Sequence, residues 1–114
     1  MAKYKLTKNS IEVYGKKLFQ VEATVSFSNI SKGELGGYIE KEDNLSQDGD
    51  AWVYGDAIVC GDAIICGDAR IYDNARVCGG AIVCGDAIVC GDAIICGDVR
   101  VCGGARVHDG EINK

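Results

Sequence analysis

The chain has 114 residues, enough for one domain, and it carries a formal net charge of −5. The negative excess lies in residues 49–114, which hold ten Asp and Glu but five Lys and Arg, whereas residues 1–48 hold seven of each sign. A mildly acidic repeat lacks the clustered Lys and Arg that a phosphate backbone requires, so direct nucleic-acid binding is not expected.

Neither a membrane span nor an export signal is expected from the sequence. No stretch approaches the roughly 20 apolar residues of a membrane span, and the start MAKYKLTKNSIEVYGKK lacks the apolar run of a signal peptide. We therefore expect a cytoplasmic protein with no membrane partner. Its seven cysteines, all between Cys60 and Cys102, are then expected to be mostly reduced thiols.

Residues 1–48 predict a β-rich segment without repeats. The stretches YKL, IEVYG, KLFQVEATVSFSNI and GGYIE are typical of short strands, with turns expected near Asn9–Ser10, Gly15–Lys16 and Gly36–Gly37. We expect this segment to pair with the first coil of the repeat that follows and to cover its open edge, since an uncovered edge invites association.

Residues 49–108 consist of ten six-residue units without an insertion. They read GDAWVY, GDAIVC, GDAIIC, GDARIY, DNARVC, GGAIVC, GDAIVC, GDAIIC, GDVRVC and GGARVH. Each unit has a small or turn-forming pair, then Ala or Val, then a β-branched aliphatic two residues later. Gly55–Asp68 recurs identically at Gly85–Asp98, a shift of thirty residues.

This period suits a short strand followed by a sharp corner. The β-branched residue is expected to point inward from each strand, the alanine to sit inside the corner, and Gly-Asp to make the bend. Three units then close a triangle of eighteen residues, and successive triangles stack at roughly 4.8 Å. The prediction is an all-β fold, a single-stranded parallel β-helix forming a triangular prism of about three to four coils. Residues 1–48 form its N-terminal β-rich capping segment, and residues 49–114 form the β-helix.

These units resemble the hexapeptide-repeat family, whose members form left-handed β-helices, and the resemblance covers residues 49–108. The expected left hand of the coil is implied by that resemblance. The junction GELGGYIEKEDNLSQDGDAWVYGDA, residues 33–57, resembles hexapeptide-repeat proteins of phage and prophage type. This resemblance implies a phage or prophage setting in a bacterial host, but it implies no biochemical activity.

Residues eighteen apart lie above one another in such a prism, and the residues that flank the inward aliphatic point outward. Six cysteines then form two ladders beside isoleucines, and flat apolar faces of this kind usually mark an association surface. The predicted interaction face consists of Ile58, Cys60, Cys78, Ile94 and Cys96 on one side of the prism and Ile64, Cys66, Ile82, Cys84 and Cys102 on another.

The sequence offers little for catalysis. Acyltransferases of this family need a general-base histidine near a protruding loop, whereas the chain has one histidine, His108, in its last full unit. A zinc site of the γ-class carbonic anhydrase type needs about three histidines. The aspartate rows are interrupted by Asn74, Gly80 and Gly104, which favours corner-turn residues over regular calcium sites. A Thr-x-Thr ice-binding face is absent. We expect no catalytic residues, no cofactor and no metal.

The cysteines allow three interpretations. Ladder thiols point in parallel and do not converge on a tetrahedral zinc ion, although adjacent thiolates suit a soft ion such as Cu(I). A Cα spacing near 4.8 Å falls within the disulfide range. Because parallel side chains make the disulfide dihedral awkward and the cytosol is reducing, free thiols acting as small hydrophobes are favoured.

The function expected from the sequence is that of a non-enzymatic scaffold. It would self-associate, as a dimer or trimer, through an Ile/Cys face or through the end of the coil. The thirty-residue duplication moves copied residues to other faces, which favours a scaffold over a site that needs a fixed row. Two alternatives remain open: a phage-encoded inhibitor of a host defence protein, and a degenerate hexapeptide acyltransferase.

Overall fold

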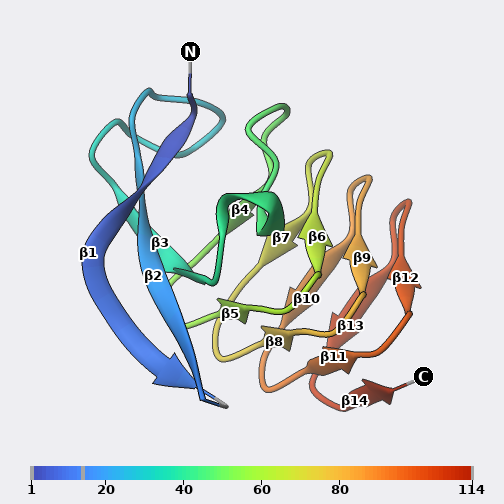
Figure 1. The fold of residues 1–114 in the computed structure, drawn as a ribbon. Coiled ribbons are helices and arrows are strands. Elements are labelled where there is room, and N and C mark those ends of the chain that lie inside the picture. The colour runs from blue at the N-terminus through green and yellow to red at the C-terminus, as the bar shows by residue number, and fades with distance from the viewer. Residues whose placement is uncertain (1, 14, 114) are drawn as a thin grey trace.

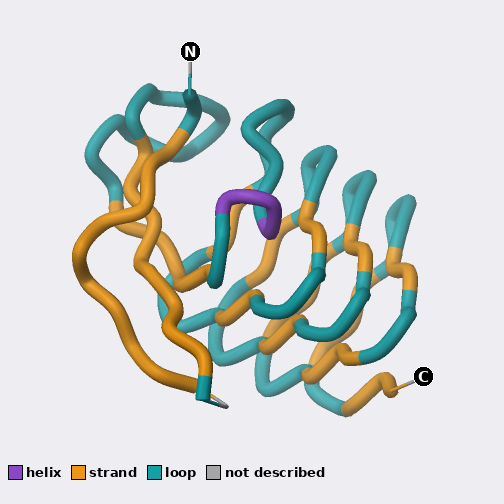
Figure 2. The backbone as a smooth tube through the Cα atoms, in the orientation of Figure 1, coloured by secondary structure: helices purple, strands orange, loops and turns teal. Residues whose placement is uncertain are grey.

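The computed structural model describes residues 2–13 and 15–113. Within that part of the chain there is no α-helix, and the helical structure is a 3-10 turn, η1 (Glu42–Asn44), in a molecule otherwise built of strands and turns (Figure 2). The coils are stacked along one axis, with the N-terminal hairpin at one end and the C-terminal strand at the other (Figure 1).

Three longer strands precede a series of short ones. The long strands are β1 (Tyr4–Val13), β2 (Lys16–Ala23) and β3 (Leu35–Ile39). The short strands are β4 (Trp52–Val53), β5 (Ile58–Val59), β6 (Ile64–Ile65), β7 (Arg70–Ile71), β8 (Arg76–Val77), β9 (Ile82–Val83), β10 (Ile88–Cys90), β11 (Ile94–Cys96), β12 (Arg100–Val101), β13 (Arg106–His108) and β14 (Glu111–Asn113).

The short strands form the three faces of a parallel β-solenoid. One face is the four-stranded sheet β13-β10-β7-β4, and another is the three-stranded sheet β12-β9-β6. The third face belongs to a seven-stranded sheet, β1-β2-β3-β5-β8-β11-β14. Val53 lies beside Ile71, and Ile71 beside Val89, so one coil takes eighteen residues. The predicted parallel solenoid and its register are confirmed.

The interior of the solenoid is filled as the six-residue pattern predicts. The inward aliphatics from Val53 to Ile95 are fully buried, and Val101 is buried at the last complete layer. The corner alanines from Ala51 to Ala93 are buried as well. Each buried aliphatic contributes about 1.5–3 kcal/mol relative to an exposed one, before the entropy of ordering is subtracted.

Glycine at the first position of most units is required by the backbone. Gly67 has φ of +66°, the left-handed region, and a Cβ there would lie 2.8 Å from the backbone nitrogen of Gly85 in the next coil. Asp73, at φ of +57°, replaces glycine in one unit. Its carboxylate accepts a hydrogen bond from the Gly91 amide at 2.9 Å, which ties it to the coil below.

The N-terminal segment is joined to the first coil through β3. Strand β3 pairs in parallel with β5, with Ile39 beside Val59, and a bridge places Leu45 beside Ile65. Ile39 and Leu45 are buried, so they add a layer to the aliphatic rows of the solenoid. Strands β1 and β2 continue the same sheet in antiparallel pairing. The expected pairing of this segment with the first coil is confirmed.

Two of the three turns predicted in this segment are wrong. The chain does not turn at Asn9–Ser10, because β1 continues through this stretch with a register shift between Leu6 and Ser10. Gly36 and Gly37 lie inside β3. A Cβ on Gly36 would lie 2.5 Å from the Val53 carbonyl oxygen, so these glycines serve a close approach between backbones instead of a bend.

The solenoid extends beyond the last hexapeptide unit. Strand β14 pairs with β11 and places Ile112 beside Ile95, an offset of seventeen residues. The final unit lacks the corner alanine, and Asp109 with Gly110 makes the shorter turn at positive φ. Residues 109–113 therefore begin a further coil in which Ile112 is half-buried against the core.

Candidate functional site

The ten residues predicted as an interaction face lie on two sides of the solenoid. Ile58, Arg76 and Ile94 are neighbours on the β5-β8-β11 side. Ile64, Ile82 and Arg100 are neighbours on the β6-β9-β12 side. The backbone amides of Cys60 and Cys66 donate to the carbonyls of Val77 and Val83, so the cysteines that follow these strands keep the same eighteen-residue register.

The N-terminal hairpin covers the first coil of the β5-β8-β11 side. Ile58 is 6% exposed and Cys60 is 3% exposed, and both pack against the fully buried Leu18 of β2. Ile11 of β1 and Tyr38 of β3 also contact this cluster. Ile58 and Cys60 were expected to face solvent. This expectation is wrong, because apolar side chains of the hairpin pack against them on the outer face of the sheet that the hairpin shares with β5.

Trp52, which flanks the inward Val53, also differs from expectation, because another part of the N-terminal segment covers it on the four-stranded side of the solenoid. It was assigned to the outside of the prism, yet it is fully buried beneath the cap. The Phe27 ring lies edge-on to it at a centroid distance of 5.4 Å, and the Tyr4 ring at 6.3 Å. Its Nε1 is buried and has no hydrogen-bond partner among the described residues. Edge-to-face aromatic packing of this kind anchors the cap on the first coil.

The covered ladder consists of the free thiols Cys60, Cys78 and Cys96, which contact one another in series. Burial raises the pKa of all three, and for Cys96 burial together with the Cys78 thiol raises it to about 11. At neutral pH these side chains are uncharged thiols. They behave as small apolar groups and are poor nucleophiles.

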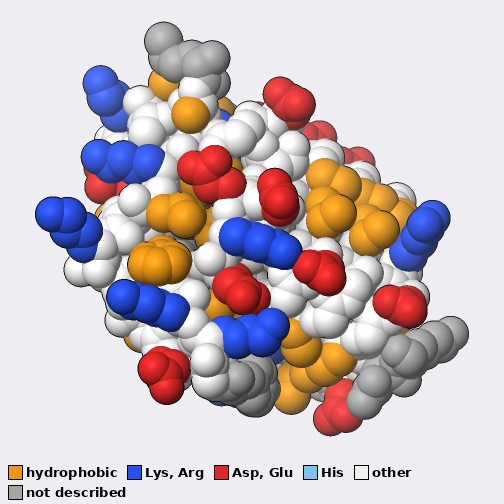
Figure 3. Space-filling view, in the orientation of Figure 1, with side chains coloured by type: hydrophobic (Ala, Val, Ile, Leu, Met, Phe, Trp, Pro, Cys, Tyr) orange, Lys and Arg blue, Asp and Glu red, His pale blue; other side chains and the backbone are white. Residues whose placement is uncertain are grey.

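The β6-β9-β12 side is open. Hydrophobic side chains gather on the surface around these strands (Figure 3). Ile64 is 40% exposed, Ile82 is half-buried and Arg100 is exposed. We call this the open face and define it by Ile64, Cys66, Ile82, Cys84, Arg100 and Cys102.

Two cysteines of the open face are joined. Cys84 and Cys102 form a disulfide across adjacent coils, with a Cα–Cα distance of 4.6 Å. The expectation of free thiols is therefore wrong for this pair, because neighbouring coils bring the two backbones within the range that a disulfide spans. Cys66, Cys90 and the covered ladder remain free thiols.

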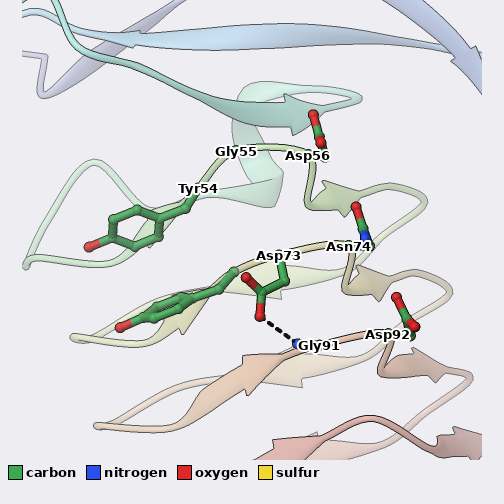
Figure 4. Close-up of a pocket in the computed structure, with 8 residues that line it drawn as sticks. Tyr54, Gly55, Asp56, Asp73, Asn74, Gly91 and Asp92 are labelled. Atoms are coloured by element: carbon green, nitrogen blue, oxygen red, sulfur yellow. Dashed lines mark hydrogen bonds between the residues drawn. The ribbon is translucent and has the colours of Figure 1, made fainter.

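The third side of the solenoid carries a groove that the sequence reasoning missed. Tyr54 and Tyr72, one coil apart, have ring centroids 4.8 Å apart and line a groove of about 600 Å³. Asp56, Asn74 and Asp92 stand in a row along it, one from each coil (Figure 4). The sequence contains a signal for this groove, because two tyrosines eighteen residues apart lie side by side in the eighteen-residue register.

A second hollow on that side has mixed charge. It has a volume of about 320 Å³ and is bordered by the aspartate row Asp50, Asp68 and Asp86 and by the outward residues Arg70, Ile88 and Arg106. The aspartates were predicted to be corner residues, and they do occupy corners. The stacking of coils also places these aspartates in a row along the hollow, and this row cannot be seen from one six-residue unit alone.

The remaining candidates for chemistry are weak. The His108 Nδ1 atom lies 3.0 Å from the Asp109 carboxylate, and both side chains are largely exposed at the last coil. Across residues 2–13 and 15–113, no three His, Cys, Asp or Glu side chains are placed to share a metal ion. No helix in the described part of the chain has the length and apolar character needed to cross a bilayer.

Comparison with known proteins agrees with the fold. A family model described as the YdcK beta solenoid repeat matches residues 69–85. No curated protein matches the chain. The matched segment covers β7, β8 and β9, which are consecutive sides of one coil. The repeat, the register and this similarity together define the chain as a β-solenoid repeat protein.

Proposed function

We propose that the protein is a non-catalytic scaffold that forms a dimer through the open face. The carrying observation is the contrast between two equivalent Ile/Cys sides. The hairpin buries Ile58 to 6% exposure, whereas Ile64, one unit further along the chain, is 40% exposed. The hairpin covers the first coil of one side only, and an apolar patch that stays exposed usually marks an association surface.

Charge favours a second copy as that partner. Arg100 is exposed at one end of the open face and has no part in the ion pairs found among the described residues. Asp68 is exposed at the corner after β6, on the coil that carries Ile64, and it also borders the hollow of the third side. A two-fold axis through Ile82 would place Arg100 of each copy near Asp68 of the other. Such an isologous contact is closed, which limits assembly to a dimer.

The mass of the protein in solution tests this proposal. Sedimentation equilibrium is expected to show a dimer that persists with reductant, because the contact is not covalent. Ile82→Lys should shift the equilibrium toward monomer. Ile88→Lys is the matched control, since Ile88 has the same repeat position and half-burial on another side. A wild-type protein that stays monomeric at high concentration would overturn the proposal.

A second candidate function rests on the grooves beside β4, β7 and β10. Their aspartate rows favour a basic segment of another protein, as an inhibitor of a host protein would require. Substituting Asp68 and Asp86 with Asn should weaken such a complex and reduce its salt dependence. A stoichiometric partner that co-purifies equally well with this variant would count against the grooves as the site.

A further inference from the structure

The open face contains three cysteines in one ladder. The Cys66 amide donates to the Val83 carbonyl, and the Cys84 amide donates to the Val101 carbonyl, each at 2.9 Å. These bonds hold the three coils in register, so Cys84 has one cysteine on either side. The neighbours are separated by about one strand spacing, roughly 4.8 Å.

One disulfide is shared among these three residues. Cys84 is bonded to Cys102, and Cys66 is a free thiol on the opposite side of Cys84. In thiol–disulfide exchange a thiolate attacks one sulfur of a disulfide and displaces the other sulfur. A straight ladder places the attacking group and the leaving group on opposite sides of the central sulfur, which is the arrangement that the reaction needs.

We propose that Cys66, Cys84 and Cys102 form an intramolecular thiol–disulfide exchange site. The Cys66 thiolate attacks the Cys84 Sγ atom, a Cys66–Cys84 bond forms, and the Cys84–Cys102 bond breaks. Cys102 leaves as a thiolate and takes up a proton from water, which replaces the proton that Cys66 released to water. No net oxidation occurs, so no external oxidant or reductant enters the step.

The exchange is confined to the open face because it needs a disulfide. Cys60, Cys78 and Cys96 have the same spacing, but all three are free thiols, and the hairpin buries Cys60. On the open face Cys84 and Cys102 are bonded, and Cys102 is exposed.

Exchange moves the free thiol across two coils. In one isomer the thiol is Cys66, within the open face; in the other it is Cys102, exposed at the last complete layer. A low-molecular-weight disulfide then reacts preferentially with the second isomer, at the coil end. The three cysteines belong to one chain, so the proposal stands whether or not the open face binds a second copy.

Disulfide mapping in a Cys96→Ser background tests the exchange. That background is needed because residues 62–67 and 92–97 have the same sequence. Thiols are alkylated at acid pH, and the protein is cut before aspartate without reduction. Residues 62–67, 73–85 and 98–108 then carry Cys66, Cys84 (with Cys78) and Cys102 on separate peptides. Fragmentation of the linked peptides distinguishes Cys84 from Cys78.

Both the Cys66–Cys84 and the Cys84–Cys102 links are expected after incubation at about pH 8. The second isomer should appear more slowly as the pH is lowered, because the thiolate is the attacking species. Detection of the Cys84–Cys102 link alone after prolonged incubation would overturn the proposal.

Two variants sharpen the test. Cys102→Ser in the same background should form the Cys66–Cys84 link in an oxidising glutathione buffer. Cys66→Ser is the control and should form the Cys84–Cys102 link, which also shows that the background folds. If the control oxidises while the Cys102→Ser variant keeps both thiols, or yields only disulfide-linked dimers on a non-reducing gel, the internal exchange is excluded.

Discussion

Leu18 of the N-terminal hairpin packs against Cys60 of the first coil, and neither side chain is more than 3% exposed. The contact joins strands that lie two positions apart in one sheet, β2 and β5, across β3. It forms an apolar cluster on the outer side of that sheet, separate from the solenoid core, and holds the hairpin against the first coil. The open face has no such cover, and this asymmetry underlies both proposals made above.

Leu18→Ala should lower the free energy of unfolding by about 2–5 kcal/mol, because it leaves a cavity between hairpin and coil. It should also speed the labelling of Cys60 by a thiol reagent. Denaturant titration and mass-resolved labelling measure the two effects. Leu35→Ala is the matched control, since Leu35 is 50% exposed, and it should change neither.

Gly36→Ala should destabilise the protein by at least about 2–3 kcal/mol, because the new methyl group meets the Val53 carbonyl oxygen and cannot be accommodated without shifting backbone. Gly104→Ala is the control: nothing lies within 4 Å of its added Cβ. Thermal unfolding compares the two variants. Equal melting temperatures would mean that β3 does not approach β4 as closely as described.

Val83→Asp should abolish folding, because a carboxylate would be buried among aliphatic side chains without a partner. A loss above about 4 kcal/mol is comparable with the lower end of the roughly 5–15 kcal/mol that stabilises a typical domain. The neighbouring Ile82→Asp places its charge on the open face and should remain folded. Circular dichroism separates the two variants, and a cooperative melt for Val83→Asp would refute its inward position.

The free energy of unfolding should depend on pH through the thiols of the covered ladder. Burial raises the pKa of Cys96 to about 11, so the folded state keeps a proton that the unfolded state loses above about pH 8.5. The unfolded state then binds fewer protons, and the free energy of unfolding falls as the pH rises between these values. Cys96→Ala should lessen that fall in denaturant titrations across this range.

Lys3 acts in the opposite sense. Its ammonium group is buried, where it donates to the Ala51 carbonyl at 2.8 Å, and burial lowers its pKa to about 8. Between about pH 8 and about pH 10.5, Lys3 is mostly deprotonated in the folded state but protonated in the unfolded state. Its contribution to the free energy of unfolding therefore increases as the pH rises through this range. Lys3→Met removes this contribution and should steepen the alkaline loss. If Lys3→Met leaves the pH dependence of the free energy of unfolding unchanged, burial does not lower the pKa of Lys3.

The six-residue repeat is enough to specify the solenoid, its register and its interior. Six-residue spacing of β-branched aliphatics, small corner residues and glycines leaves one way to bury Val53 through Ile95, so residues eighteen apart had to be neighbours. That register also predicted the cysteine ladders. The reason is that contacts inside a solenoid repeat locally and follow from a period.

Which side of the solenoid is covered depends instead on how the N-terminal segment packs. Residues 1–48 have no period, and a bulge in β1 with two close-packed glycines in β3 sets where the hairpin lies. That placement buries Trp52, Ile58 and Cys60 and leaves Ile64 exposed, although Ile58 and Ile64 occupy equivalent positions in successive units. Equivalent residues acquire different roles because their neighbours come from a segment distant in sequence, whose packing no repeat specifies.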